Sequence, residues 1–300
     1  MIAFGALAVR VTSALTQQGD QSLGSRMTRR RFAKPCSFSS RKTARCYGFQ
    51  GLLGLRSLPL CFPGLAAHAN GADLEQMVNL VGERPDAIAL DMGYGGGHVT
   101  FRLAPLLKKV VAYDLSESML TVVADESRRR GLNNVTIQKG AVESLPYPAE
   151  SFDVVVSRYS AHHWQDISAG LAEMRRVLKP GGLAICMDVI APEQPLLDTW
   201  LQSLELLRDP PHVRDASLTE WCDWLSKAGF VIDTVMKLRL RLEFSAWVER
   251  MKTPKHQVIA IRSLQERAGS DVTQYFAMED DGSFTVNTVL IYAKAIDNNG

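Results

Sequence analysis

Cysteines are few in this sequence and long apolar runs are missing, and both absences exclude classes of protein. The five cysteines form no C-x-x-C pair and no zinc-binding pattern. We therefore expect a reduced, cytoplasmic protein without a structural metal site. The apolar stretch 47–67 is interrupted by Arg56, Pro59 and Pro63, so no membrane span is predicted.

Acidic residues are nearly absent from the first 70 positions, which contain ten Lys or Arg but only Asp20. Because this leader keeps no helical or alternating apolar period, we expect residues 1–67 to be a disordered or aberrant extension of a catalytic domain at 68–300. Its composition leaves two alternatives open, a mitochondrial transit peptide and a basic tail that contacts nucleic acid. The rest of the chain has 24 basic and 31 acidic residues, which argues against nucleic acid as its partner.

After position 70, short apolar runs alternate with amphipathic segments, which predicts a parallel sheet with helices on both faces. The expected strands are 87–90, 110–113, 135–138, 153–157, 183–190, 231–242 and 284–293. The expected helices are 72–81, 98–108, 167–178, 196–207 and 218–228. A further helix is expected to begin at a cap at 116 or 118 and to run to 130. Residues 245–280 are expected to be helical and irregular. This order predicts a doubly wound, Rossmann-like α/β fold.

The loop after the first expected strand lacks the residues that two common nucleotide sites require. It reads D-x-G-x-G-x-G from Asp91 to Gly97. No lysine follows the glycines, as a P-loop would need, and His98 stands where the dinucleotide fingerprint needs Gly or Ala. Glycines permit positive φ angles and let a ligand approach the backbone closely. The loop is therefore predicted to be a cofactor cradle of another kind.

A second candidate for cofactor binding ends the second expected strand. Asp114 follows Asp91 by 23 residues. In nucleotide-binding α/β folds, an acidic residue at about this distance accepts hydrogen bonds from ribose hydroxyls. A helix cap before the next segment is the alternative role.

Two later segments complete a pattern with these anchors. They are Q-K-G-A-V-E-S-L-P-Y-P-A-E-S-F-D at 138–153 and R-V-L-K-P-G-G at 176–182. The whole pattern resembles class I S-adenosylmethionine-dependent methyltransferases, especially the group with the ubiquinone and menaquinone C-methyltransferases and many uncharacterised bacterial enzymes. The resemblance implies a seven-stranded sheet whose last strand is antiparallel, S-adenosyl-L-methionine as cofactor, and methyl transfer to a small-molecule acceptor.

The resemblance also implies which residues bind the cofactor. They are Asp91, Gly93, Gly95, Gly97, Asp114, Leu115, Met119, Ala141, Val142, Glu143 and, through backbone groups, Arg158. The sequence departs from the family at Ala141, where an aspartate would face the adenine. Backbone groups at 141 and 142, or the Glu143 side chain, would have to substitute for it.

The acceptor side of the site is less defined. A general base is needed only if the acceptor holds its proton tightly. His163 is the best candidate for such a base, with Asp188 as a second catalytic candidate, whereas packing of His163 with Trp164 is the structural alternative. Insertions at 191–217 and 243–283 are expected to cover the acceptor, and their basic residues at 250–256 either bind an acidic substrate or lie on a solvated helix face.

Three other functions stay open on the sequence. A catalytically silent adenosylmethionine-binding regulator would have the same motifs, and a dehydrogenase would require the failed fingerprint to be misleading. An RNA methyltransferase would use the basic leader to bind its substrate. The acidic body favours a small-molecule acceptor over RNA.

Overall fold

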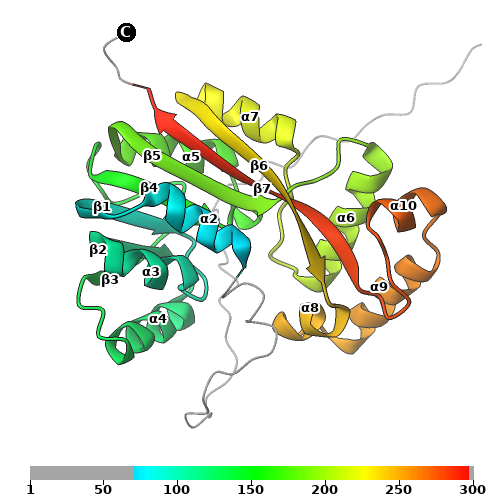
Figure 1. The fold of residues 1–300 in the computed structure, drawn as a ribbon. Helices are drawn as coiled ribbons and strands as arrows, with labels where there is room; N and C mark the ends of the chain where they lie inside the picture. Colours follow the sequence, from blue (N-terminus) through cyan, green and yellow to red (C-terminus); the bar gives the residue numbers. More distant parts are fainter. Residues whose placement is uncertain (1–70, 297–300) are drawn as a thin grey trace, which may run out of the picture. The chain divides into compact units, whose positions relative to one another are not determined.

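Seven strands form one sheet in the order β3-β2-β1-β4-β5-β7-β6 (Figure 1). The computed structural model describes residues 71–296, so the predicted leader, 1–67, lies outside the described residues. The strands are β1 (Arg84–Met92), β2 (Leu107–Asp114), β3 (Val135–Lys139), β4 (Phe152–Arg158), β5 (Leu178–Val189), β6 (Phe230–Leu242) and β7 (Phe284–Ala295). β1 to β5 pair in parallel, and β7 is antiparallel to both β5 and β6. The predicted fold class, with its antiparallel last strand, is confirmed.

Helices cover both faces of this sheet because its central strands are apolar on both sides. Val154 and Val156 of β4 pack in a core cluster with α2 and α3, whereas Val155 packs in a second cluster with α5 and α7. The helices are α2 (Ala72–Val81), α3 (His98–Leu103), α4 (Glu117–Arg129), α5 (Ile167–Val177), α6 (Pro195–Arg208), α7 (Leu218–Lys227), α8 (Phe244–Arg250), α9 (Lys255–Glu266) and α10 (Ser270–Tyr275). None of the helices in the described range is both long and apolar enough to cross a membrane.

Apart from shifts of up to three residues at other strand ends, two elements differ from the sequence-based expectation. The helix expected over 98–108 ends at Leu103 and continues as a short 3-10 turn, η2 (Ala104–Leu106), because Pro105 cannot donate a helical hydrogen bond. β5 begins five residues earlier than expected, at Leu178. The Lys-Pro-Gly-Gly segment interrupts its pairing with β4, since Phe152 pairs with Leu178 but Val154 pairs with Leu183. The breaker residues therefore form a bulge inside the strand pairing and not a turn before it.

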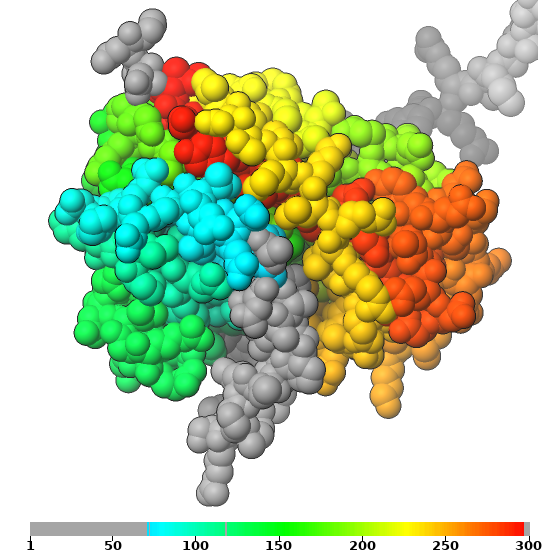
Figure 2. Space-filling model, viewed as in Figure 1, coloured from blue at the N-terminus to red at the C-terminus, as the bar shows by residue number. Residues whose placement is uncertain are grey.

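The two late insertions pack against each other as one lobe. α6 contacts α9 and α10, and these helices share an apolar cluster with the far ends of β6 and β7. Trp247, Phe276 and Phe284 are buried in this cluster. In Figure 2 the orange α9 and α10 lie at one side of the molecule and the cyan α2 at the other, with β6 crossing between them.

The strand order reverses between β1 and β4, which lie side by side in parallel. Ligands of open α/β sheets bind at such a point, outside the carboxyl ends of the strands. Here the glycine loop follows β1, and a second loop with the 3-10 turn η3 (Ala161–His163) follows β4. The predicted cofactor and acceptor residues therefore meet at the same edge.

Candidate active site

The glycine loop has three positive φ angles, 72° at Gly93, 49° at Gly95 and 76° at Gly97. A Cβ atom at Gly93 would lie 1.7 Å from Ser160 Oγ, and one at Gly97 would lie 2.8 Å from the Phe101 ring. Gly95 differs, because a Cβ atom there would meet nothing within 4 Å. Two of the glycines thus permit close packing, and the middle one faces open space that a ligand can enter.

Asp114, at the end of β2, connects the glycine loop to the segment that follows β2. One carboxylate oxygen accepts the Gly95 N–H at 3.2 Å, and the other accepts the Ser116 N–H at 2.8 Å. The next apolar side chains are unusually exposed, 65% for Leu115 and 41% for Met119. An acidic group beside exposed apolar side chains suits a ligand with both polar hydroxyls and a flat apolar ring.

Asp91 is buried below the loop, where its carboxylate has one partner. The Thr100 hydroxyl donates to Oδ2 at 2.6 Å, and Oδ1 has no partner among the described residues. Burial raises the pKa of Asp91 to about 7, with a smaller contribution in the opposite direction from the hydrogen bond of Thr100. A buried carboxylate oxygen without a donor fits a ligand with positive charge, such as the amino or sulfonium group of S-adenosylmethionine.

The segment after β3 includes Ala141, the position at which the sequence departs from the family. The Tyr113 hydroxyl donates to the Ala141 carbonyl at 3.1 Å, and Val142 is buried. The Glu143 carboxylate accepts the Gln165 N–H at 2.9 Å. Glu143 therefore holds the loop that follows η3, which leaves backbone groups as the candidates for contact with an adenine.

The side chain of Arg158, at the end of β4, pairs with α2. Its guanidinium donates to Asp73 of α2, with Nε at 2.8 Å from Oδ2, and the side chain is 5% exposed. Tyr159, which follows it, has a positive φ of 51°. The guanidinium of Arg158 is thus already paired, and the backbone contact with a cofactor that the resemblance implies stays a prediction.

Asp188 on β5 pairs with His162 and not with His163. His162 Nδ1 donates to Asp188 Oδ1 at 2.7 Å, and Oδ2 accepts the Ala161 and His162 N–H groups at 2.9 and 3.3 Å. Burial alone would lower the pKa of His162, but the carboxylate of Asp188 raises it to about 9. The pair is therefore an imidazolium and a carboxylate at neutral pH.

His163 has a different environment on the same 3-10 turn. Its Nδ1 lies 3.4 Å from the Pro211 carbonyl and its Nε2 lies 3.6 Å from Asp209 Oδ2. Burial and the neighbouring His162 charge lower the pKa of His163, so this imidazole is neutral at pH 7. Its side chain is 35% exposed. An exposed neutral imidazole has the properties of a general base.

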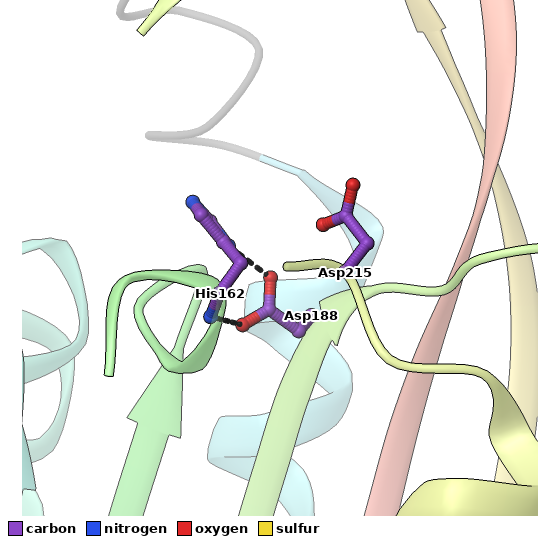
Figure 3. Close-up of side chains that lie close together, drawn as sticks. All are labelled: His162, Asp188 and Asp215. Atoms are coloured by element: carbon purple, nitrogen blue, oxygen red, sulfur yellow. Dashed lines mark hydrogen bonds and ion pairs between the residues drawn. The ribbon is translucent and has the colours of Figure 1, made fainter. Parts of the chain in front are cut away.

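Three side chains at this edge are spaced closely enough to be compared with a metal site. His162, Asp188 and Asp215 present ligand atoms within 4.8 Å of one another (Figure 3). However, Val189 also donates to Asp188 Oδ1, so each oxygen of Asp188 already accepts two N–H groups. A metal ion would have to displace the His162 hydrogen bond, and we therefore treat His162 and Asp188 as a hydrogen-bonded pair with Asp215 beside it.

Sequence reasoning missed two members of this region, His212 and Asp215. Both belong to the loop between α6 and α7, and both side chains are 2% exposed. The Asp-Pro-Pro-His sequence at 209–212 predicts only a turn. A buried histidine in a proline-containing loop has no periodic pattern that could have identified it.

The fold and this edge together define a class of protein. The glycine loop after β1, the acidic residue after β2 and the antiparallel β7 match the arrangement that the sequence motifs imply for class I S-adenosylmethionine-dependent methyltransferases. A model of the methyltransferase domain family matches residues 90–186. The chain belongs to this family and is an S-adenosylmethionine-dependent methyltransferase.

Individual relatives support this assignment over most of the chain. The uncharacterized protein YafE of Escherichia coli is 47% identical over 201 residues, which cover 67% of this chain and 97% of YafE. The uncharacterized methyltransferase YcgJ of Bacillus subtilis is 33% identical over 228 residues, 74% of this chain and 90% of YcgJ. The crystal structure of YcgJ has a TM-score of 0.74 at 30% identity and covers 76% of this chain and all of YcgJ.

The similarity to the ubiquinone/menaquinone biosynthesis C-methyltransferase UbiE is more limited. UbiE of Shewanella sp. strain W3-18-1 is 32% identical over 124 residues, which cover 40% of this chain and 49% of UbiE. The shared part is thus about half of that enzyme.

Proposed function

We propose that this enzyme transfers a methyl group from S-adenosylmethionine to a small-molecule acceptor bound between the sheet edge and the lobe of α6, α8, α9 and α10. The observation that supports this most is the contact of Gly93 with Ser160, where a Cβ atom would lie 1.7 Å from Oγ. This contact joins the glycine loop after β1 to the histidine loop after β4. A cofactor in the cradle would therefore lie beside the imidazole groups.

The cofactor side of the proposal rests on Gly95, which faces open space, on the unpaired Oδ1 of Asp91, and on Asp114, whose two oxygens each accept one N–H and can accept another donor. Gly95 and Asp114 would contact the nucleoside, with Leu115 and Met119 beside its ring, and Asp91 would face its positive charge. S-adenosylmethionine supplies a methyl group already activated on a sulfonium. The protein has to hold the reactants in line and exclude water, which can contribute several kcal/mol.

On the acceptor side, we propose that His163 accepts a proton where the acceptor has one to lose. Asp188 would act through His162 as a positioning residue, because its oxygens hold the backbone of the turn that includes His163. An apolar lobe above a polar edge can enclose a small molecule. The lobe insertions 191–217 and 243–283 would form this cover.

The test is transfer of an isotopically labelled methyl group. Purified protein, a cell extract and labelled S-adenosylmethionine should yield a labelled small molecule by mass spectrometry. Binding without transfer to any fraction would favour a silent regulator. Salt-sensitive label in RNA would favour the nucleic-acid alternative.

Asp114→Ala provides the binding test. Loss of hydrogen bonds from the two ribose hydroxyls to a charged acceptor should cost about 1.5–3 kcal/mol each, so calorimetry should show at least a tenfold weaker affinity. Asp125→Ala removes an exposed carboxylate of α4 and is the matched control. Equal affinity of the wild type and Asp114→Ala would remove Asp114 from the site.

A further inference from the structure

The loop 209–217 carries two buried polar atoms that have no partner among the described residues, His212 Nδ1 and Asp215 Oδ2. The loop lies over the turn that follows β4, since the Val213 and Arg214 N–H groups donate to the His162 carbonyl at 2.8 and 3.2 Å. The His162 and His212 ring centroids are 5.6 Å apart. Unsatisfied atoms at this place point to a ligand that supplies the missing bonds.

Gln202 of α6 fixes the proton of His212. Its side-chain oxygen accepts the Asp215 N–H at 3.0 Å, and its NH₂ group donates to the Asp215 carbonyl at 2.9 Å. These backbone partners determine the orientation of the amide. The same oxygen lies 3.0 Å from His212 Nε2, so Nε2 has to carry the proton. In a neutral His212, Nδ1 is therefore a bare lone pair.

The charge of His212 follows from its surroundings. Burial lowers the pKa of His212 to about 4; the charge of Glu205 opposes this effect, whereas the charges of His162 and Arg208 act in the same direction as burial. His162, held by Asp188, is a cation at the same pH. Two neighbouring imidazoles in opposite protonation states are typical of sites that assign a donor and an acceptor role.

We propose that His212 determines acceptor specificity, because its Nδ1 accepts a hydrogen bond from a hydroxyl or amino group of the methyl acceptor. The inference rests on the proposed function. Acceptors that offer only carbonyl or anionic oxygens leave this lone pair unmatched. Nδ1 is buried in the arrangement described, so the proposal requires that acceptor binding break the two hydrogen bonds from Val213 and Arg214 to the His162 carbonyl.

Two substitutions separate recognition from structure. His212→Gln keeps an N–H donor at the position of Nε2, and therefore the bond to Gln202, but removes the lone pair at Nδ1. His212→Asn places an amide at the position of Nδ1 and removes the bond to Gln202. Lys227→Gln, in an exposed side chain of α7, is the control.

The variants are compared by labelled transfer to a metabolite extract, calorimetry with S-adenosylmethionine, melting temperature and ¹⁵N NMR of the imidazoles. We expect His212→Gln to melt like the wild type, to bind the cofactor equally and to transfer at least tenfold less methyl. His212→Asn should melt at a lower temperature but retain more transfer per folded protein. NMR should show the proton on Nε2 in the wild type at pH 7.

Two results would contradict the proposed role of His212, and a third would contradict the proposed methyl transfer as well. Undiminished transfer by His212→Gln, or a proton on Nδ1 in the wild type, would contradict it while leaving methyl transfer intact. Absence of transfer by the wild type to any extract would refute the proposed function itself, and the role of His212 with it.

Discussion

At the scale of single residues, the pair of His162 and Asp188 predicts how stability depends on pH. The pKa of His162 is about 9 in the folded protein and about 6.5 in an unfolded chain. A raised histidine pKa stabilises the folded state fully below pH 6.5, and this contribution is lost as pH rises towards 9. Urea unfolding should show a loss of up to about 3 kcal/mol between these values.

His162→Gln should remove most of that pH dependence, because it removes the titrating imidazole. His256→Gln should retain it. The interpretation fails if wild type and His162→Gln lose stability in parallel over this range.

We expect the buried carboxylate of Asp91 to lower the free energy of unfolding of the ligand-free protein. Its pKa of about 7 lies above that of an unfolded aspartate, so ionisation above pH 4 destabilises the folded state increasingly up to about pH 7. Asp91→Asn should raise the free energy of unfolding by up to about 4 kcal/mol at pH 8 and change little below pH 4. The amide oxygen can still accept from Thr100.

The same substitution should weaken S-adenosylmethionine binding, because the negative charge is gone. Calorimetry and denaturant unfolding of one preparation measure both effects. A variant that is less stable at pH 8, or that binds as tightly as the wild type, would contradict this account of Asp91.

The sequence predicted the positions of residues at the ends of regular strands, because the strand–helix–strand connection fixes where those residues lie. Asp91 is the last residue but one of β1 and Asp114 is the last residue of the neighbouring parallel strand β2, so their distance along the chain predicts that they share an edge, and they do. His162 and His163 are adjacent in the chain but face different partners on a 3-10 turn. Their spacing carries no signal for which of them meets Asp188, and only the three-dimensional contacts distinguish them.

At the scale of elements, the central strands were predictable because valine-rich runs of this length are typical of strands buried on both faces. β4 starts one residue before its expected first residue and ends one after its expected last. β5 was less predictable. A Pro-Gly-Gly sequence is compatible with either a turn before a strand or a bulge within one. Here the residues before and after this sequence both pair with β4, so it forms a bulge.

The contact between two loops gives a prediction at this scale. Gly93→Ala places a Cβ atom 1.7 Å from Ser160 Oγ at a positive φ, which should cost about 2–4 kcal/mol of stability. Ser160→Gly in the same chain should relieve the clash but not the backbone strain. A double-mutant cycle by urea unfolding should therefore give a coupling energy above about 1 kcal/mol.

Gly95→Ala is the matched control, since it has a positive φ but no atom within 4 Å of its Cβ position. It should show only the strain and no coupling to Ser160. Additive effects of Gly93→Ala and Ser160→Gly would mean that the two loops do not restrain each other.

At the scale of the whole molecule, the lobe is the part that sequence order conceals. α6 lies between β5 and β7 in the chain, whereas α8 to α10 follow β6, yet they share one apolar cluster with Phe284. Amphipathic patterns identify each helix as partly buried but do not name its partner. The helices of the lobe fall within the predicted insertions, but the packing between the two insertions was not predicted.

The last prediction concerns the leader, which provides ten of the 34 basic residues. Because it has no apolar period and no motif, removal of residues 1–65 should leave the melting temperature and the affinity for S-adenosylmethionine unchanged. Thermal unfolding and calorimetry on the full chain and on the shortened chain measure both. Transfer of a labelled methyl group to a metabolite extract and to total RNA is then measured for both chains. The comparison shows which substrate depends on residues 1–65. Equal labelling of the same small molecule by both chains is expected, whereas RNA labelling that vanishes with the leader would make those charges a substrate-binding device.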